Sequence, residues 1–273
     1  MLIACESDPE VDIPFEPTKL VLTSFLDPSA DTNIVHLSKT DPIFDNQSSY
    51  FDELNISNGI VKISDGTNEF NLRYDANNRY YFFRRNDFNI DYNKNYSITA
   101  SAINQTISKN IRTIDSSKVE IVSFNIDQSN YSDDFGTYSV YKARVEFKDP
   151  ANENNFYRIY LSPIYEDIFN PGQEYDYFYD VYSNTLISDE GRNGGNIVAL
   201  TEHSEYDGGF GNNITGFRLY IYKVDEDVYK YVKSLKNYTG DDPFSEPSLI
   251  YSNVPGGLGL VGSQMVFSVK KTL

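Results

Sequence analysis

The sequence predicts a mainly β protein, with an N-terminal immunoglobulin-like β-sandwich followed by a second antiparallel β domain that carries one helix. Three observations predict this fold class. Apolar and polar residues alternate along many short runs, which is the period of a half-buried strand. The 23 tyrosines and 18 phenylalanines favour sheets whose faces are partly solvated. One stretch, near residues 225–238, has the apolar spacing of an amphipathic helix.

The first predicted domain covers residues 18–116. We expect its strands at 20–25, 34–37, 60–64, 70–74, 79–83 and 96–101. The residues Asp65-Gly66-Thr67-Asn68 separate two of these runs and predict a hairpin loop. About six or seven short strands with turns between them are typical of an immunoglobulin-like sandwich. Because the cysteine and tryptophan marks of antibody domains are absent, the prediction concerns architecture alone.

The second predicted domain covers residues 117–273. In its clearest strand we expect alternate residues to point inward, namely Tyr141, Ala143, Val145 and Phe147. The residues expected to face outward are Lys142, Arg144 and Glu146. In the strand before it, we expect a shared face formed by Val122, Phe124 and Ile126. Further strands are expected at 156–164, 197–201 and 217–222, and, as one bent strand or two, at 175–187.

The helix near 225–238 is predicted by its ends as well as by its apolar face. Asp225 is the expected N-cap, acids follow it in the first turn, and lysines come later, as the helix dipole favours. Gly240 suits the helix exit. The residues of the expected apolar face are Val228, Tyr231, Val232, Leu235 and Tyr238.

The segment 242–262 connects this helix to the last expected strand, 263–269. We expect it to hold a short buried strand made of Leu249, Ile250, Tyr251 and Val254. The glycines that follow allow positive φ and close approach of the backbone. Gly257, Gly259 and Gly262 form a literal G-x-G-x-x-G, but a dinucleotide site needs a helix directly after it. A strand pattern follows instead, which favours a structural turn.

The composition excludes several kinds of site. A net charge of −17 argues against binding to nucleic acid and to anionic membrane surfaces, both of which need clustered cations. Cys5 is the only cysteine, so neither an internal disulfide nor a cysteine-based metal site can form. The only histidines are His36, expected within a strand, and His203, expected in a loop, and no nucleophile signature accompanies them. We therefore predict no enzyme activity, no catalytic residues, no metal ligands and no cofactor.

Two kinds of stretch leave a ligand open. Four acidic loops are rich in oxygen ligands and suit either calcium or simple solvation. They are Asp133-Asp134, 149–155, 188–196 and 205–213. The tyrosine-rich run 175–182 suits either a sugar or peptide platform or ordinary packing between strands. The sequence does not decide between these alternatives.

Residues 1–17 are expected to form a signal remnant, a lipidated cysteine and an acidic tether. Met1-Leu2-Ile3-Ala4-Cys5 resembles the end of a bacterial lipoprotein signal peptide, with an apolar residue three positions before the cysteine and a small residue directly before it. This resemblance implies that Cys5 carries acyl chains that anchor the protein to outer-membrane lipid. Residues 6–17 are rich in acids and prolines, a composition that does not fold alone.

The last part of the chain resembles a known family. The residues that carry the resemblance are Tyr229 to Leu235, Asp242-Pro243-Phe244-Ser245-Glu246-Pro247, and Ile250 to Gly259, with Tyr206 to Phe210 and Lys19 to Leu22 in support. They are similar to the Bacteroidota lipoproteins catalogued as domain of unknown function four-two-four-nine. The resemblance covers nearly the whole chain from Cys5 and is most specific in the last 50 residues. It implies an outer-membrane lipoprotein, often encoded beside TonB-dependent receptors, and it brings no site residues. The acidic residues just after Cys5 resemble the export signal that sends Bacteroidota lipoproteins to the outer cell surface, so we expect the protein to face the cell exterior.

Three functions are compatible with these observations. The first is a non-enzymatic accessory or ligand-capture subunit that works beside a TonB-dependent transporter. The second is a structural or adhesive surface module without a ligand. The third is a hydrolase of surface glycans or peptides, whose paired carboxylates cannot be picked from 40 acids without a structure.

Overall fold

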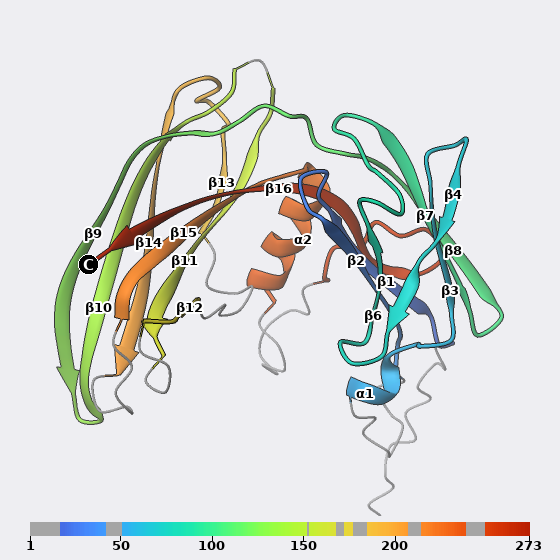
Figure 1. Cartoon of the computed structure of the whole chain (residues 1–273), viewed down its shortest axis with the longest axis horizontal. Helices are drawn as coiled ribbons and strands as arrows, with labels where there is room; N and C mark the ends of the chain where they lie inside the picture. Colours follow the sequence, from blue (N-terminus) through green and yellow to red (C-terminus); the bar gives the residue numbers. More distant parts are fainter. Residues whose placement is uncertain are drawn as a thin grey trace, which may run out of the picture.

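The fold is mainly β, which confirms the predicted class (Figure 1). The computed structural model describes residues 17–41, 51–151, 153–167, 172–176, 185–206, 214–238 and 249–273. In the first part of the chain the elements are β1 (Leu20–Leu26), β2 (Thr32–Lys39), α1 (Phe51–Leu54), β3 (Ile60–Ser64), β4 (Glu69–Asn71), β5 (Arg73–Asp75), β6 (Tyr80–Arg84), β7 (Asn95–Ala102) and β8 (Gln105–Arg112). In the second part they are β9 (Glu120–Asp133), β10 (Gly136–Lys148), β11 (Phe156–Glu166), β12 (Glu174–Asp176), β13 (Thr185–Ser188), β14 (Asn196–Tyr206), β15 (Ile214–Val224), α2 (Glu226–Lys236) and β16 (Leu258–Thr272).

One long sheet runs through both halves of the molecule. Its strand order is β12-β11-β15-β16-β1-β2-β6-β5, with β13 also paired to β11. A four-stranded sheet, β4-β3-β7-β8, faces it in the N-terminal half, and a three-stranded sheet, β14-β10-β9, faces it in the C-terminal half. In Figure 1 the long sheet forms an arch, and α2 lies on the concave side below β16.

Strand β16 joins the two halves because it belongs to both. Its first part, Leu258–Ser263, pairs parallel with β1, while Gln264–Thr272 pairs antiparallel with β15. The other strand pairs among the described residues are antiparallel. The sheet of the N-terminal half therefore includes residues from near the other end of the chain.

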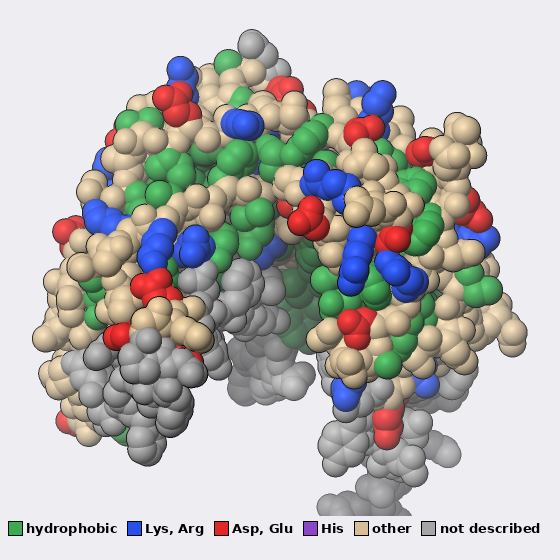
Figure 2. Space-filling model, viewed as in Figure 1, with side chains coloured by type: hydrophobic (Ala, Val, Ile, Leu, Met, Phe, Trp, Pro, Cys, Tyr) green, Lys and Arg blue, Asp and Glu red, His purple; other side chains and the backbone are tan. Residues whose placement is uncertain are grey.

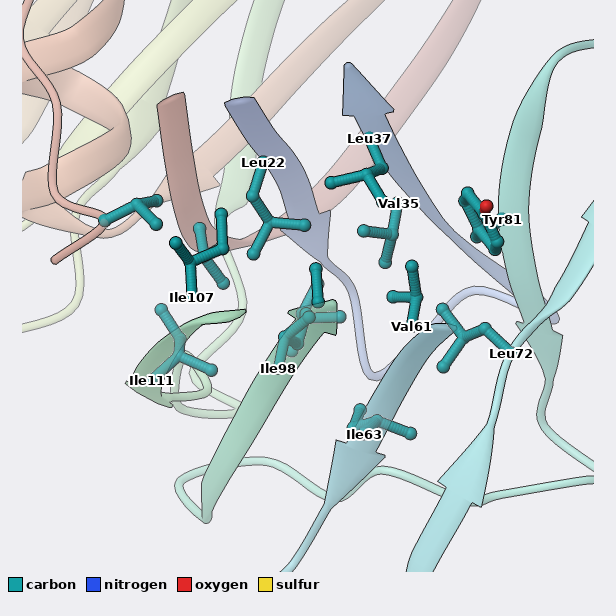
Figure 3. Packing of buried hydrophobic residues seen from close by; sticks show 14 of the residues in the cluster. Leu22, Val35, Leu37, Val61, Ile63, Leu72, Tyr81, Ile98, Ile107 and Ile111 are labelled. Carbon is teal, nitrogen blue, oxygen red and sulfur yellow. The ribbon is translucent and has the colours of Figure 1, made fainter. Parts of the chain in front are cut away.

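The N-terminal core lies between two sheets, which is consistent with the expected sandwich. Figure 3 shows its aliphatic side chains from β1 and β2 of the long sheet meeting those of β3, β7 and β8 in the facing sheet. One expected strand, 70–74, is wrong in its extent, because the chain crosses there from one sheet to the other. Its first part, β4, pairs with β3, and its second part, β5, pairs with β6. Buried Leu72 lies at the crossing, and its amide donates to the carbonyl of Val61.

The C-terminal core lies between β9-β10-β14 and β11-β15-β16. The alternation expected along β10 is confirmed, since Tyr141, Ala143, Val145 and Phe147 are all buried in it. The expected position of Val122 is wrong, because that side chain is exposed while Phe124 and Ile126 pack on the core. The register slips there: Glu146 pairs with Ser123, and Phe147 with Ile121. This β-bulge inserts Val122 without a partner and reverses which side chains face inward.

The helix is confirmed as α2, which begins after the predicted N-cap Asp225. Val228 and Val232 are fully buried against Val224 and Leu260, with Tyr231 and Tyr251 packed at the edge of this small core. Tyr238, expected on the same face, is about half exposed because α2 ends at Lys236. Gly240 lies outside the described residues.

The buried strand expected from Leu249 to Val254 is wrong. Leu249 is 92% exposed, the segment has no strand structure, and only Val254 of the expected set is buried. The side chain of Asn253 forms the hydrogen bonds that a strand would have formed here. Its NH2 group donates to the Val261 carbonyl and its oxygen accepts from the Val261 amide, each at 2.9 Å. These two bonds satisfy backbone groups of β16 that a neighbouring strand would otherwise satisfy.

The glycine-rich turn is structural, as expected. Gly256 and Gly259 have positive φ, at 76° and 104°. Gly257 is required for a different reason, since a Cβ atom there would lie 2.7 Å from the carbonyl oxygen of Leu20. Gly262 is equally crowded, because its Cβ would meet Val228 of α2 at 2.3 Å. The three glycines of the G-x-G-x-x-G thus bring β16 close to β1 and to α2.

Candidate functional site

Asp225 and Ser263 tie the two halves of the molecule together. The two carboxylate oxygens of Asp225 accept from the amides of Val228 and Ser263, at 2.8 and 2.6 Å. The hydroxyl of fully buried Ser263 donates to the carbonyl of Leu26 at 2.9 Å and accepts from the amide of Ile114 at 3.0 Å. The cap of α2 is therefore connected to β16, to the end of β1 and to the segment that links β8 to β9. We call these four residues, Asp225, Ser263, Leu26 and Ile114, the joint.

The pH dependence of stability is expected to report on Asp225. Burial raises the pKa of this carboxyl to about 6. Because a raised pKa means that the folded state holds its proton more tightly than the unfolded state, the contribution is complete below about pH 4 and is lost as the pH rises through 6. Relative to Asp225→Asn, wild type should gain about 3 kcal/mol of unfolding free energy between pH 7 and pH 4, since each pKa unit is worth about 1.4 kcal/mol. Urea unfolding of both proteins between pH 7 and pH 4 measures this gain. A difference in unfolding free energy between the two proteins that stays constant with pH would contradict the prediction.

A buried lysine lies beside this joint. Lys223 in β15 is 2% exposed, and its ammonium donates to Asp115 Oδ2 at 2.6 Å and to Ser117 Oγ. The Glu153 carboxylate lies 3.6 Å from the same nitrogen. Burial alone would raise the pKa of Asp115, but hydrogen bonds from Lys223 and Ser117 lower it to about 2. Two hydrogen bonds and a second carboxylate nearby make Lys223 a buried structural cation whose charge is balanced by acids.

A pocket of about 380 Å³ opens at the joint, and it includes Asn155, Glu153 and Asp225 among its lining residues.

The sequence analysis did not identify Lys223 as a buried cation, although its position in the strand pattern indicates one. A lysine between Tyr222 and Val224 in an otherwise apolar strand is a buried cation that needs a carboxylate partner.

A larger groove lies over the C-terminal half. It measures about 800 Å³ and lies between β10, β14, β13 and the end of α2. The residues that line it are Asp127, Lys142, Ala143, Arg144, Thr185, Leu200, Thr201, Glu202, Ser204 and Lys236. We call this set the groove.

Charges of both signs alternate in the groove. Lys142 on β10 pairs across the sheet with Asp127 on β9 and with Glu202 on β14. Arg144 lies opposite Leu200, which is an exposed apolar residue. The groove therefore offers cations, carboxylates, hydroxyls and one apolar side chain within a volume typical of small-ligand sites. The sequence placed Lys142 and Arg144 on the outward face but gave no sign that β13, β14 and α2 would complete a groove around them.

An exposed aromatic group lies at the end of the β9–β10 hairpin. Phe135 in the turn is 83% exposed, and Tyr131 near the end of β9 is also exposed. The ring of Tyr131 lies 6.5 Å from that of Tyr138, between centroids. Exposed aromatic side chains that cluster in this way are typical of surfaces that contact another molecule.

The structure places both histidines in strands. His36 lies in β2 with its ring edge-on to Tyr80. His203 was expected in a loop but lies in β14, because that strand extends to Tyr206. Its Nε2 is 3.0 Å from Glu205 Oε2, and Glu205 also accepts from the hydroxyl of Tyr165. These contacts hold His203 beside Phe217 at the edge of the core.

The other candidates of the sequence analysis fall partly outside the described residues. Cys5 does so entirely, as does most of the tyrosine-rich run 175–182. Two of the four acidic loops, 149–155 and 188–196, pack against each other. Within the described part of the chain, no three or more His, Cys, Asp or Glu side chains are grouped as a metal site.

Comparison with protein families identifies the chain. A family model described as "Domain of unknown function (DUF4249)" matches residues 6–269. The chain belongs to this family. A search of curated proteins finds no match. The matched range contains every residue of the joint, the groove and the hairpin end, so all three are features of the DUF4249 region itself.

Surface charge on this DUF4249 protein is mixed. Figure 2 shows acidic and basic side chains interspersed over the visible face of the arch, despite the net charge of −17. No helix among the described residues has the length and apolar character needed to cross a membrane.

Proposed function

We propose that this DUF4249 protein is a non-enzymatic ligand-capture subunit, held on the outer face of the outer membrane by acyl chains on Cys5 and associated with a TonB-dependent transporter. The groove carries the proposal. Its volume of about 800 Å³ is suited to a small ligand, and its walls hold cations and carboxylates that face each other across neighbouring strands. Such a surface selects a polar ligand with charges of both signs.

The sequence supports the place of action. The Leu2-Ile3-Ala4-Cys5 pattern and the acidic, proline-rich residues after it support a lipid anchor on Cys5 followed by an acidic tether. A tether would let the groove bind ligand outside the membrane and then pass the ligand to the transporter. The exposed hairpin end at Phe135 provides a surface for contact with the transporter.

The anchor is tested by fractionation. With a complete signal peptide in front, Cys5→Ala is expected to release a folded, soluble protein, because the acyl chains supply the membrane affinity. Wild type should stay with the outer membrane through a high-salt wash. If Cys5→Ala also stays with the membrane through that wash, the lipid anchor is excluded.

Ligand capture is tested with the groove. Tagged wild type, the Lys142→Glu/Arg144→Glu double variant and Lys148→Glu are purified from native outer membrane, and molecules released from each by acid are compared by mass spectrometry. Lys148 is an exposed cation of the same strand outside the groove, so its variant is the matched control. Wild type and Lys148→Glu should release a common compound that the double variant lacks, and all three should co-purify with a β-barrel receptor. Identical release from all three would exclude the groove.

A structural or adhesive surface module is the second candidate, and the exposed aromatic end of the β9–β10 hairpin favours it. If the protein is such a module, Phe135 contacts a neighbouring surface and the groove binds no ligand. Phe135→Ser would then remove co-purifying protein, and the double groove variant would release the same molecules as wild type.

A further inference from the structure

Two acidic turns, 149–155 and 189–195, form one compact unit beside the end of β11. The amide of Asp189 donates to the carbonyl of Asn155 at 3.1 Å, and the amide of Asp149 donates to the carbonyl of Gly195 at 3.0 Å. The amide of Gly194 donates to Asp149 Oδ2 at 3.0 Å. Gly194 has a positive φ of 78°, and a Cβ atom there would lie 2.7 Å from that of Ala151. The two turns are thus pressed together as closely as their backbones allow.

Two side-chain oxygens buried in this unit have no hydrogen-bond donor. Asp189 is 3% exposed and Asn155 is 2% exposed, and the atoms without a partner are Asp189 Oδ2 and Asn155 Oδ1. The orientation of the Asn155 amide is fixed, because its nitrogen donates to the carbonyls of Pro150 and Glu153. The oxygen is therefore the atom that remains without a partner.

A second buried carboxylate, that of Asp149, belongs to the same unit. Asp149 is also buried and accepts from the hydroxyl of Tyr157 and from Gly194. Burial, then the hydrogen bond to Asp149 and the charges of Asp149 and Asp189, raise the pKa of Tyr157. Both carboxylates therefore act on the same buried hydroxyl.

Buried acceptors without donors are costly, and most buried polar groups have partners. Two acceptors beside a second carboxylate call for a positively charged partner. We propose that Asp189 and Asn155, with Asp149 behind them, bind one calcium ion that holds the 149–155 turn against the 189–195 turn. The oxygen-only ligands suit a hard cation, and backbone carbonyls and water complete its coordination.

The chemistry of the ligands explains why charge alone does not reveal the site. One of the two oxygens without a partner belongs to an amide, and asparagine oxygens bind calcium as carboxylates do. Asn155 also lines the pocket of about 380 Å³ at the joint, which gives an ion a path from solvent. A buried water would satisfy the same oxygens without any dependence of stability on metal.

The test is thermal melting of wild type, Asp189→Asn and Asp134→Asn, each in calcium, in magnesium and in chelator, at constant ionic strength. Asp134 is the matched control, an exposed acid in a different acidic loop. At calcium concentrations a hundredfold above Kd, mass action raises the melting temperature of wild type by about 5 °C or more. Asp134→Asn should respond like wild type. Asp189→Asn should not respond, and in chelator it should melt at or above wild type because its buried charge is gone.

Two results would overturn the proposal: no calcium-dependent rise in wild type, or an equal rise in all three proteins. Equilibrium dialysis of wild type with radioactive calcium decides the matter if Asp189→Asn does not fold. Binding of about one ion per chain supports the site, and no binding above background excludes it.

Discussion

Replacing Gly259 with alanine is expected to lower the melting temperature by roughly 5–20 °C. Gly259 lies in β16 beside β1, with a φ of 104° that L side chains rarely adopt. A Cβ atom there would lie 2.3 Å from the carbonyl oxygen of Leu22, and backbone cannot move aside as a side chain can. The strained φ costs about 1–3 kcal/mol, and overpacking about as much again. Each kcal/mol lowers the melting temperature by about 2–4 °C in a protein of this size.

Gly66→Ala separates these two costs. Gly66 also has a positive φ, at 90°, but a Cβ atom there would have no neighbour within 4 Å. Its variant therefore measures backbone strain alone, and the difference between the two variants measures the contact between β16 and β1. Differential scanning calorimetry of the three proteins gives both numbers. Equal losses in the two variants would mean that the contact with Leu22 is relieved without cost.

Replacing Lys223 with alanine is expected to cost about 3–5 kcal/mol of unfolding free energy, the usual effect of breaking a buried ion pair by removing one partner. The change leaves Asp115 and Ser117 without their common donor and empties the space that the lysine stem fills. It should also change the response to acid. The pKa of Asp115, about 2 in wild type, should return towards that of the unfolded state. The stability that wild type loses as the pH falls from about 4 to 2 should then be absent from the variant.

Lys62→Ala is the matched control for Lys223→Ala. Lys62 forms a 2.7 Å ion pair with Glu69, but both side chains are largely solvated. An exposed pair of this kind contributes about 1 kcal/mol or less. Denaturant unfolding of both variants, together with Lys223→Met/Asp115→Asn, measures the effect. The double variant should recover part of the loss because it fills the space and removes the unpaired charge. A loss below about 1 kcal/mol in Lys223→Ala would contradict the assignment of Lys223 as a buried, paired cation.

Local patterns in the sequence predicted local structure well. The alternation from Tyr141 to Phe147 placed every inward side chain of β10, and the acids after Asp225 located the start of α2. Both depend on residues within a few positions of one another. Val122 was misplaced because a β-bulge is decided by the partner strand, whose register is not written in the residues around Val122.

Long-range pairing accounts for most of what the sequence did not show. In the parallel contact of β1 with β16, Val21 pairs with Leu258, and no local pattern around either residue predicts this pairing. Asn253 is a second example, because a side chain that replaces a strand cannot be told from an ordinary loop residue before Val261 is known to lie beside it. The groove and the two packed acidic turns depend on such distant contacts as well, so their residues were visible in the sequence but their grouping was not.

The shared strand β16 has a consequence for how the molecule is made. When β1 leaves the ribosome, residues 258–263, which will lie beside it, have not been synthesised. Among the described strand pairs, β1 and β16 are the farthest apart in the sequence. Loop closure over such distances slows folding, and an unpaired edge strand is a site for association with other chains. One edge of β1, which carries Leu20 and Leu22, therefore stays unpaired until residues 258–263 have been synthesised. We therefore expect the pairing of β16 with β1 to be a late step of folding.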